Sequence, residues 1–240
     1  MPDPIAAGLW GMLAASALVL GAIAAMTLRI PRRIVALVMA FGAGALVSAL
    51  AFDLSEEAFR VGGTLTFGLG IAVGAIGYYA GDRLIKRMGG RRADSGPRTN
   101  GPAIVLGVLL DGIPESLVLG ATLIGGAGIS PSFLAAVVVS NLPEGLAGTR
   151  DLTEEGHRRR WVIGLWLVVA LISGLSAAIG NAVLSDVGSK LLAFAQSLAA
   201  GAILTMLANT MFPEAFENGG DRVGLATAVG FAAAFLLSRT

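Results

Sequence analysis

The stretch that decides the fold is Asp111-Gly112-Ile113-Pro114-Glu115, which lies inside a long apolar run of the 240-residue chain. A second stretch, Ser140-Asn141-Leu142-Pro143-Glu144, lies inside the next apolar run. Each places a proline directly before a glutamate. An ionisable side chain at the centre of a bilayer costs roughly 2.5–3.5 kcal/mol, so such residues mark a cavity, a partner or an ion. We therefore expect the rest of the chain to hold these two stretches together within a membrane.

The composition is that of a membrane protein. Hydrophobic residues make up 55% of the chain and charged residues only 14%, whereas soluble domains carry about 25% charged residues. The mean hydropathy is +0.78, and the 34 glycines suit helices that approach closely in lipid. The lack of cysteine excludes a disulfide framework and a thiolate metal site. No nucleophile–base pair or nucleotide motif is present, so we expect neither an enzyme nor a nucleic-acid partner.

Eight apolar runs are long enough to cross the hydrocarbon core, which takes about 20 residues of helix. The runs are continuous rather than alternating, which excludes a β-barrel and requires helices. We predict an all-α polytopic membrane protein with eight transmembrane helices in a single transmembrane domain over residues 1–240. The predicted spans are 5–28, 34–55, 64–82, 102–126, 131–149, 161–184, 189–212 and 222–238.

Basic residues gather in the loops that follow the odd-numbered spans. By the positive-inside rule these loops are cytoplasmic, which places both termini on the non-cytoplasmic side of the cell membrane. Residues 88–101, rich in glycine, arginine and serine, are predicted to form a flexible cytoplasmic loop.

The chain also matches itself at a shift of 157 residues, so that span two resembles span seven. The two spans run in opposite directions, and spans four and five echo each other in the same way. This is the pattern of inverted-topology repeats, which place the substrate site of secondary transporters near the midplane. The matched segments are Ala43-Gly44-Ala45 with Ala200-Gly201-Ala202, Glu57-Ala58-Phe59 with Glu214-Ala215-Phe216, and Gly62-Gly63 with Gly219-Gly220.

The two proline–glutamate stretches carry the oxygen ligands of a candidate metal site. Asp111 and Glu115 are four residues apart and share a helix face, as do Ser140 and Glu144. Asn141 is three residues from Glu144 and can join that face. Each proline removes a helical hydrogen bond and frees a carbonyl. Carboxylate, amide and carbonyl oxygens suit a divalent cation, which would be the substrate rather than a cofactor. The alternative is a pair of kinked helices whose protonated carboxyls cap the freed carbonyls.

These motifs resemble those of the ZIP family of divalent-metal transporters. That family has eight spans, with His-Asn-x-Pro-Glu-Gly in span four and His/Gln-Asn-x-Pro-Glu-Gly in span five. Here they read Asp111-Gly112-Ile113-Pro114-Glu115-Ser116 and Ser140-Asn141-Leu142-Pro143-Glu144-Gly145. Phe41-Gly42-Ala43-Gly44 and Phe212-Pro213-Glu214 extend the resemblance to spans two and seven.

The resemblance implies a ZIP-like 3+2+3 inverted-repeat arrangement, with Glu115, Glu144 and Asn141 as metal ligands. Four departures change the donor set, and the first is that Gly112 replaces the span-four asparagine. Asp111 stands where span four usually has histidine, Ser140 replaces the span-five histidine or glutamine, and Ala177 replaces a span-six glutamate. Because nitrogen ligands are fewer, two possibilities stay open: a substrate ion harder than zinc, and a family member that no longer transports.

Further polar residues fall along an expected pathway. Asp53 and Glu57, at the outer end of span two, form either an acidic funnel for cations or a solvated helix end. Asn209 and Glu214, in span seven, are candidates for the inner exit. We expect a transporter that moves a divalent cation of the Zn/Mn/Fe class toward the cytoplasm. Two alternatives stay open: a non-transporting scaffold or metal sensor, and a proton-coupled carrier of another solute. Exposed small-residue faces are compatible with a homodimer.

Overall fold

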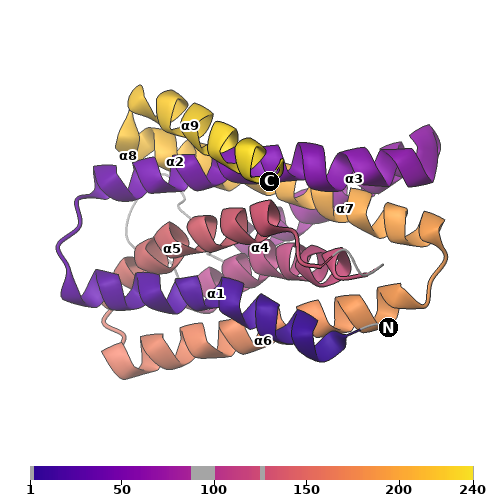
Figure 1. Ribbon diagram of the computed structural model, residues 1–240. Helices are drawn as coiled ribbons and strands as arrows, with labels where there is room; N and C mark the ends of the chain where they lie inside the picture. The colour runs from indigo at the N-terminus through magenta and orange to yellow at the C-terminus, as the bar shows by residue number, and fades with distance from the viewer. Residues whose placement is uncertain (1–2, 88–100, 125–127, 240) are drawn as a thin grey trace.

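The computed structural model describes residues 3–87, 101–124 and 128–239, and the predicted loop 88–101 lies almost wholly outside them (Figure 1). The described residues form helices joined by short connections, which confirms the all-α prediction. In chain order the helices are α1 (Pro4–Thr27), α2 (Arg32–Ala49), the π-helical segment η1 (Leu50–Ser55), α3 (Glu56–Arg87), α4 (Gly101–Thr122), α5 (Pro131–Glu154), α6 (Arg159–Ser185), α7 (Ser189–Met206), the π-helical segment η2 (Leu207–Met211), α8 (Phe212–Gly219) and α9 (Arg222–Leu237).

Local sequence signals account for where some of these helices begin. The carboxylate of Asp3 caps α1 by accepting a hydrogen bond from the Ala6 amide at 2.9 Å, with Pro4 at the first helical position. The hydroxyl of Ser130 caps α5 in the same way through the amide of Phe133, and Pro131 follows it. Both arrangements satisfy amide groups that a helix start leaves without an internal partner.

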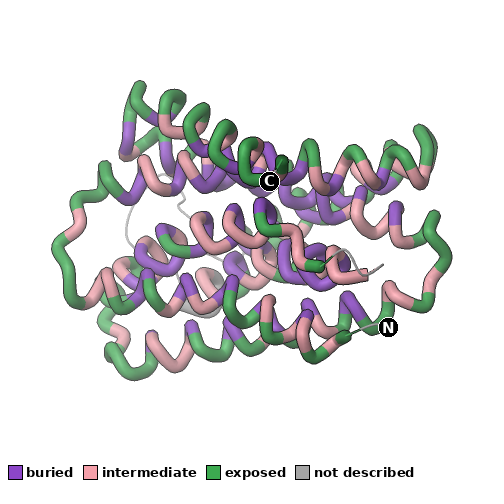
Figure 2. Tube along the Cα trace, viewed as in Figure 1, coloured by how far each residue is buried: buried purple, intermediate pink, exposed green. Residues whose placement is uncertain are grey.

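The protein is a multi-pass helical membrane protein. Five helical stretches of the described chain are long and apolar enough to cross a bilayer, and α9 is a shorter apolar helix. The stretches are Pro4–Thr27, Arg32–Arg87, Ile104–Thr122, Arg159–Ser185 and Ser189–Gly219. Large apolar side chains such as Leu65, Ile76 and Leu225 are exposed. Exposed residues cover the outward sides of the peripheral helices while buried residues face inward, as expected of a surface that contacts lipid (Figure 2).

The helices pack as two bundles. The first bundle consists of α1, α4, α5 and α6, and the second consists of α2, α3, α7, α8 and α9, with η1 and η2. Figure 1 shows α4 and α5 in the middle, with α1 and α6 below them and the second bundle above. Glycines let paired helices approach closely, because a Cβ on Gly74 of α3 would lie 1.8 Å from the Leu198 carbonyl oxygen of α7. A Cβ on Gly44 of α2 would lie 2.0 Å from the Thr227 carbonyl oxygen of α9.

Two unusual backbone features recur at the shift of 157 residues. The π-helical segments begin at Leu50 and at Leu207. Beyond each segment the chain turns at a glycine with positive φ, Gly63 at 71° and Gly220 at 64°. Figure 1 shows α2 and α7 starting from opposite ends of the molecule and running in opposite directions. The matched sequence segments therefore correspond to matched backbone irregularities.

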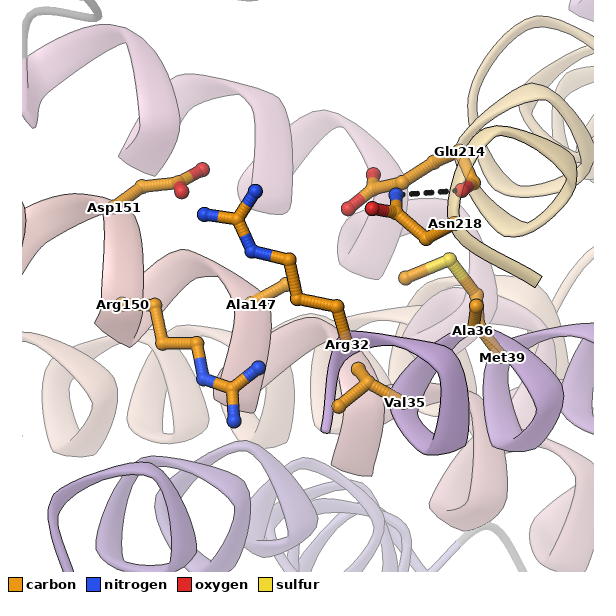
Figure 3. A pocket seen from close by; sticks show the side chains of 9 residues that line it. All are labelled: Arg32, Val35, Ala36, Met39, Ala147, Arg150, Asp151, Glu214 and Asn218. Carbon is orange, nitrogen blue, oxygen red and sulfur yellow. Dashed lines mark hydrogen bonds between the residues drawn. The ribbon is translucent and has the colours of Figure 1, made fainter. Parts of the chain in front are cut away.

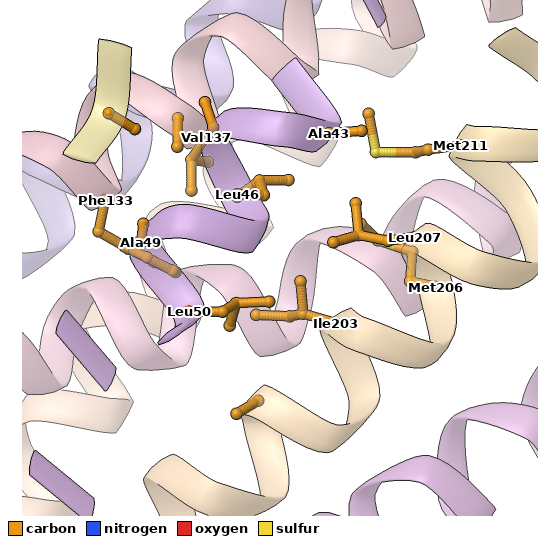
Figure 4. Close-up of a cluster of buried hydrophobic side chains, with 14 of the residues drawn as sticks. Ala43, Leu46, Ala49, Leu50, Phe133, Val137, Ile203, Met206, Leu207 and Met211 are labelled. Atoms are coloured by element: carbon orange, nitrogen blue, oxygen red, sulfur yellow. The ribbon is translucent and has the colours of Figure 1, made fainter. Parts of the chain in front are cut away.

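An apolar core joins the two bundles. Leu46 and Leu50 of the second bundle pack near Ile203 and Leu207 of the same bundle and near Phe133 of α5 (Figure 4). These residues lie toward the end of the molecule where α5 begins.

The close approach of α3 and α7 generates a stability prediction. Gly74→Ala should lower the free energy of unfolding by about 1–3 kcal/mol, because its Cβ would overlap the α7 backbone. Gly77→Ala, on the same helix with no atom within 4 Å of the added Cβ, should change it by less than about 1 kcal/mol. Thermal denaturation of the two variants in one detergent measures the difference, and equal midpoints would contradict the packing argument.

Candidate metal site

Four of the five predicted ligands line one cavity of about 320 Å³ between the two bundles. Asp111 and Glu115 come from α4, and Ser140 and Glu144 come from α5. The cavity extends from these residues toward Lys86, at the end of α3, and the ends of α5 and α8. Its lining also includes Met39, Ile104, Val108, Ala147, Gly148, Asp151, Met206, Asn209, Thr210, Met211, Pro213, Glu214 and Glu217.

The helix geometry brings these oxygens together. Pro114 and Pro143 both lie inside continuous helices, so the spacing of four residues holds across each motif. Asp111, Glu115 and Ser140 are at most 4% exposed. The Ser140 hydroxyl donates to the Val137 carbonyl oxygen at 3.0 Å, and its oxygen lone pairs can still accept or coordinate.

Asn141 takes a different direction. It is buried, and its amide nitrogen donates to the Ala14 carbonyl oxygen of α1 at 3.2 Å. The residues that line the cavity do not include it. In this conformation Asn141 links α5 to α1 within the first bundle. Its predicted role as a ligand would require the side chain to leave that contact.

The acidic groups are spread along the cavity wall. Among the residues that the structure describes, no three side chains of histidine, cysteine, aspartate or glutamate converge closely enough to hold a metal ion. Asp111 and Glu115 on one helix and Ser140 and Glu144 on another line the same cavity without forming such a cluster. A bound cation would have to draw the two helices together or complete its shell with water.

The predicted pathway residues divide between two regions. Asn209 and Glu214 line the cavity, and their role at an inner exit stays a prediction. Asp53 does not line it and instead accepts hydrogen bonds from the hydroxyls of Ser130, at 2.9 Å, and Ser132. Glu57 lies on the surface and pairs with Arg60 at 2.7 Å. Neither Asp53 nor Glu57 is therefore part of the cavity wall.

Sequence reasoning missed one face of α3. Lys86 lines the cavity, and its ammonium nitrogen lies 2.6 Å from a carboxylate oxygen of the buried Asp82. Tyr78, four residues before Asp82, donates to a carboxylate oxygen of Asp111 at 2.5 Å. The spacing 78, 82, 86 was the available signal, because it places three polar residues on one helix face. Hydropathy does not reveal this face, because the predicted span ends at residue 82, whereas α3 continues to Arg87.

A smaller cavity of about 40 Å³ adjoins the first and shares four of its residues. Figure 3 shows Arg32 and Arg150 beside Asp151 and Glu214 in this cavity. Asn218 donates to the backbone oxygen of Glu214 at 3.0 Å. The acidic groups at this end of the interface are therefore accompanied by arginines from α2 and α5.

Comparison with known proteins finds one informative similarity. No protein-family model matches the chain. The chain is 26% identical over 181 residues to an Arabidopsis thaliana protein named "Putative zinc transporter At3g08650". The match covers 73% of this chain and 29% of that protein, so the chain spans less than a third of the relative's length. This distant similarity agrees with the resemblance to the ZIP family drawn from the two motifs.

The ion pair on α3 generates a second stability prediction. Lys86→Gln should destabilise the protein by about 1–3 kcal/mol, because it removes a charge-assisted hydrogen bond from a buried carboxylate. Arg60→Gln breaks the exposed pair with Glu57 and should cost less than about 1 kcal/mol. Thermal midpoints of both variants give the comparison. A smaller loss for Lys86→Gln than for Arg60→Gln would show that the buried pair does not support α3.

Proposed function

We propose that the chain is a secondary transporter of divalent metal cations of the Zn/Mn/Fe class. The observation that carries the proposal is the single cavity lined by Asp111, Glu115, Ser140 and Glu144. Two proline–glutamate motifs from different helices meet there, inside a multi-pass helical protein. The distant similarity to a protein named as a zinc transporter supports the same class of substrate, and it favours transport over catalysis.

The proposed membrane arrangement has eight spans with a 3+2+3 inverted repeat. Gly63 divides the stretch Arg32–Arg87 into two legs, and α9 supplies a further short leg after Gly220. α5 is not among the apolar stretches because polar and charged residues gather from Ser140 to its end, and it lies in the interior where such residues are tolerated. With the basic loops in the cytoplasm, both termini lie on the non-cytoplasmic side of the cell membrane. A homodimer stays a prediction.

The proposed ligands are oxygen donors. Glu115 and Glu144 form the centre of the site, with Asp111 and Ser140 beside them, and Asn141 joins if it leaves its contact with α1. Carboxylate-rich sites suit harder ions such as Mn²⁺, while histidine nitrogen favours Zn²⁺. The donor set of this chain therefore supports a preference shifted from zinc toward manganese or ferrous iron.

The shape of the interface is compatible with the proposed direction of transport, toward the cytoplasm. The cavity runs from the carboxylates past Asn209 and Glu214 toward the loops that the charge pattern places in the cytoplasm. Asp53 and Glu57 do not line the cavity, and Asp53 contacts the start of α5, whereas the cavity reaches Asp151 near the end of α5. This conformation suits release of a cation to the cytoplasm. Uptake from outside would require the first bundle to move against the second.

Two alternatives remain as outcomes of the tests below. A metal sensor or scaffold without transport is favoured by the open spacing of the acidic groups among the described residues. A proton-coupled carrier of another solute would use the same carboxylates without binding a metal.

Removing the two central charges tests the transporter directly. Glu115→Gln and Glu144→Gln should each lower Mn²⁺ uptake into proteoliposomes by at least about tenfold, because each removes a charged ligand worth more than about 1.4 kcal/mol. Glu57→Gln, on the surface and away from the cavity, is the matched control and should retain uptake. Metal binding without flux in the wild-type protein would favour the sensor, and proton flux without metal would favour the carrier.

Restoring nitrogen ligands tests the basis of selectivity. Asp111→His combined with Ser140→His should raise the uptake of Zn²⁺ relative to Mn²⁺ by about tenfold, because imidazole suits zinc better than oxygen donors do. Competition of unlabelled Zn²⁺ against labelled Mn²⁺ provides the measurement. An unchanged ratio would mean that neither position contacts the ion.

A further inference from the structure

The hydroxyl of Tyr78 forms a polar link across the boundary between the two bundles. Tyr78 belongs to α3 of the second bundle and is 3% exposed. Its hydroxyl donates to Asp111 on α4 of the first bundle at 2.5 Å. It also lies 3.4 Å from the hydroxyl of Thr210 in η2. One buried hydroxyl group therefore connects a proposed cation ligand to two elements of the opposite bundle.

Tyr78 reaches Asp111 from behind the cavity. Asp111 and Thr210 line the cavity wall, whereas Tyr78 is not among its lining residues. The aromatic ring instead packs in the apolar core. The hydroxyl therefore fixes one carboxylate oxygen of Asp111 without itself lining the cavity.

We propose that Tyr78 is a positioning residue for the cation site and that it links the affinity of the site to the relative placement of the two bundles. The inference rests on the proposed function. Hydrogen bonds from outside a coordination shell orient the ligating groups, and their loss costs about 10–100-fold in metal affinity. Because donor and acceptor belong to different bundles, a relative movement of the bundles breaks this bond. Asp111 is then oriented for the cation in one arrangement and released in the other.

The repeat supports a role for this contact in bundle placement. Thr210 in η2 is the counterpart of Asp53 in η1 at the shift of 157 residues. Asp53 accepts hydrogen bonds from Ser130 and Ser132 at the start of α5. Both π-helical segments thus direct a polar side chain to the boundary with the first bundle. π-helical turns inside α-helices are frequent at functional sites, and here they occur where the second bundle contacts α5 and the Asp111 network.

Tyr78→Phe removes the hydroxyl while keeping the ring in the core. Titration of the purified full chain in lipid nanodiscs with MnCl₂ should give a dissociation constant at least about tenfold higher than that of the wild type. The KM for Mn²⁺ uptake should rise by a similar factor. Tyr79→Phe is the matched control, because the neighbouring hydroxyl is bonded to Arg83 and its ring is exposed. It should leave both values unchanged.

A double-variant cycle tests whether Tyr78 acts through Asp111. Asp111→Ala, which removes the acceptor, should weaken Mn²⁺ binding, and adding Tyr78→Phe to it should cause less than a twofold further change. Independent, multiplying losses would overturn the proposal, as would a lower thermal midpoint of Tyr78→Phe with unchanged affinity. Glu115→Gln separates failure of the positioning role from failure of the cation site. If Glu115→Gln loses Mn²⁺ binding and Tyr78→Phe binds Mn²⁺ normally, the positioning role alone is refuted. Normal binding in both variants refutes the cation site itself.

Discussion

The structure depends on keeping several carboxylates inside a helical assembly that is otherwise apolar. Asp111 and Glu115 are almost completely buried on one face of α4, where an uncompensated charge is costly. Three neighbouring features relate to this constraint. A cavity lies next to the carboxylates, Tyr78 donates to Asp111, and Lys86 lines the same space from α3. A protein without a use for these groups could replace them with leucine at a gain in stability.

Close helix packing makes such a site compatible with a membrane. Lipid chains are as apolar as leucine, so helices associate through backbone contact rather than through hydrophobic burial. Gly145, directly after the second motif, shows the connection, because a Cβ there would lie 2.2 Å from the Leu18 carbonyl oxygen of α1. Gly21 of α1 makes the reciprocal contact with Leu142. The motif helix is thus fixed to α1 at the turn where Glu144 enters the cavity.

Much of the arrangement could be predicted from the sequence, and the reasons for the gaps are physical. Continuous apolar runs predict helices because lipid leaves the backbone no other partner, and a spacing of four residues places Asp111 beside Glu115. Hydropathy could not show that α3 continues past residue 82, because Lys86 reads as a loop cation until Asp82 is seen to pair with it. Spacing also could not decide whether the Asn141 side chain points toward Glu144 or toward α1. Both directions are open to a residue at this position of α5, and only tertiary packing selects one of them.

The two halves of the chain share a backbone and differ in chemistry, and this difference makes two arrangements of the bundles unequal in free energy. The same π-helical position holds Asp53 in one half and Thr210 in the other. Asp53 binds two serine hydroxyls at the start of α5, while Thr210 lines the cavity beside the Tyr78–Asp111 bond. Two identical halves would make the inward and outward arrangements equal in free energy. Asp53 in one half and Thr210 at the matching position of the other remove that equality, so the unloaded protein favours one arrangement and a bound cation can shift the balance.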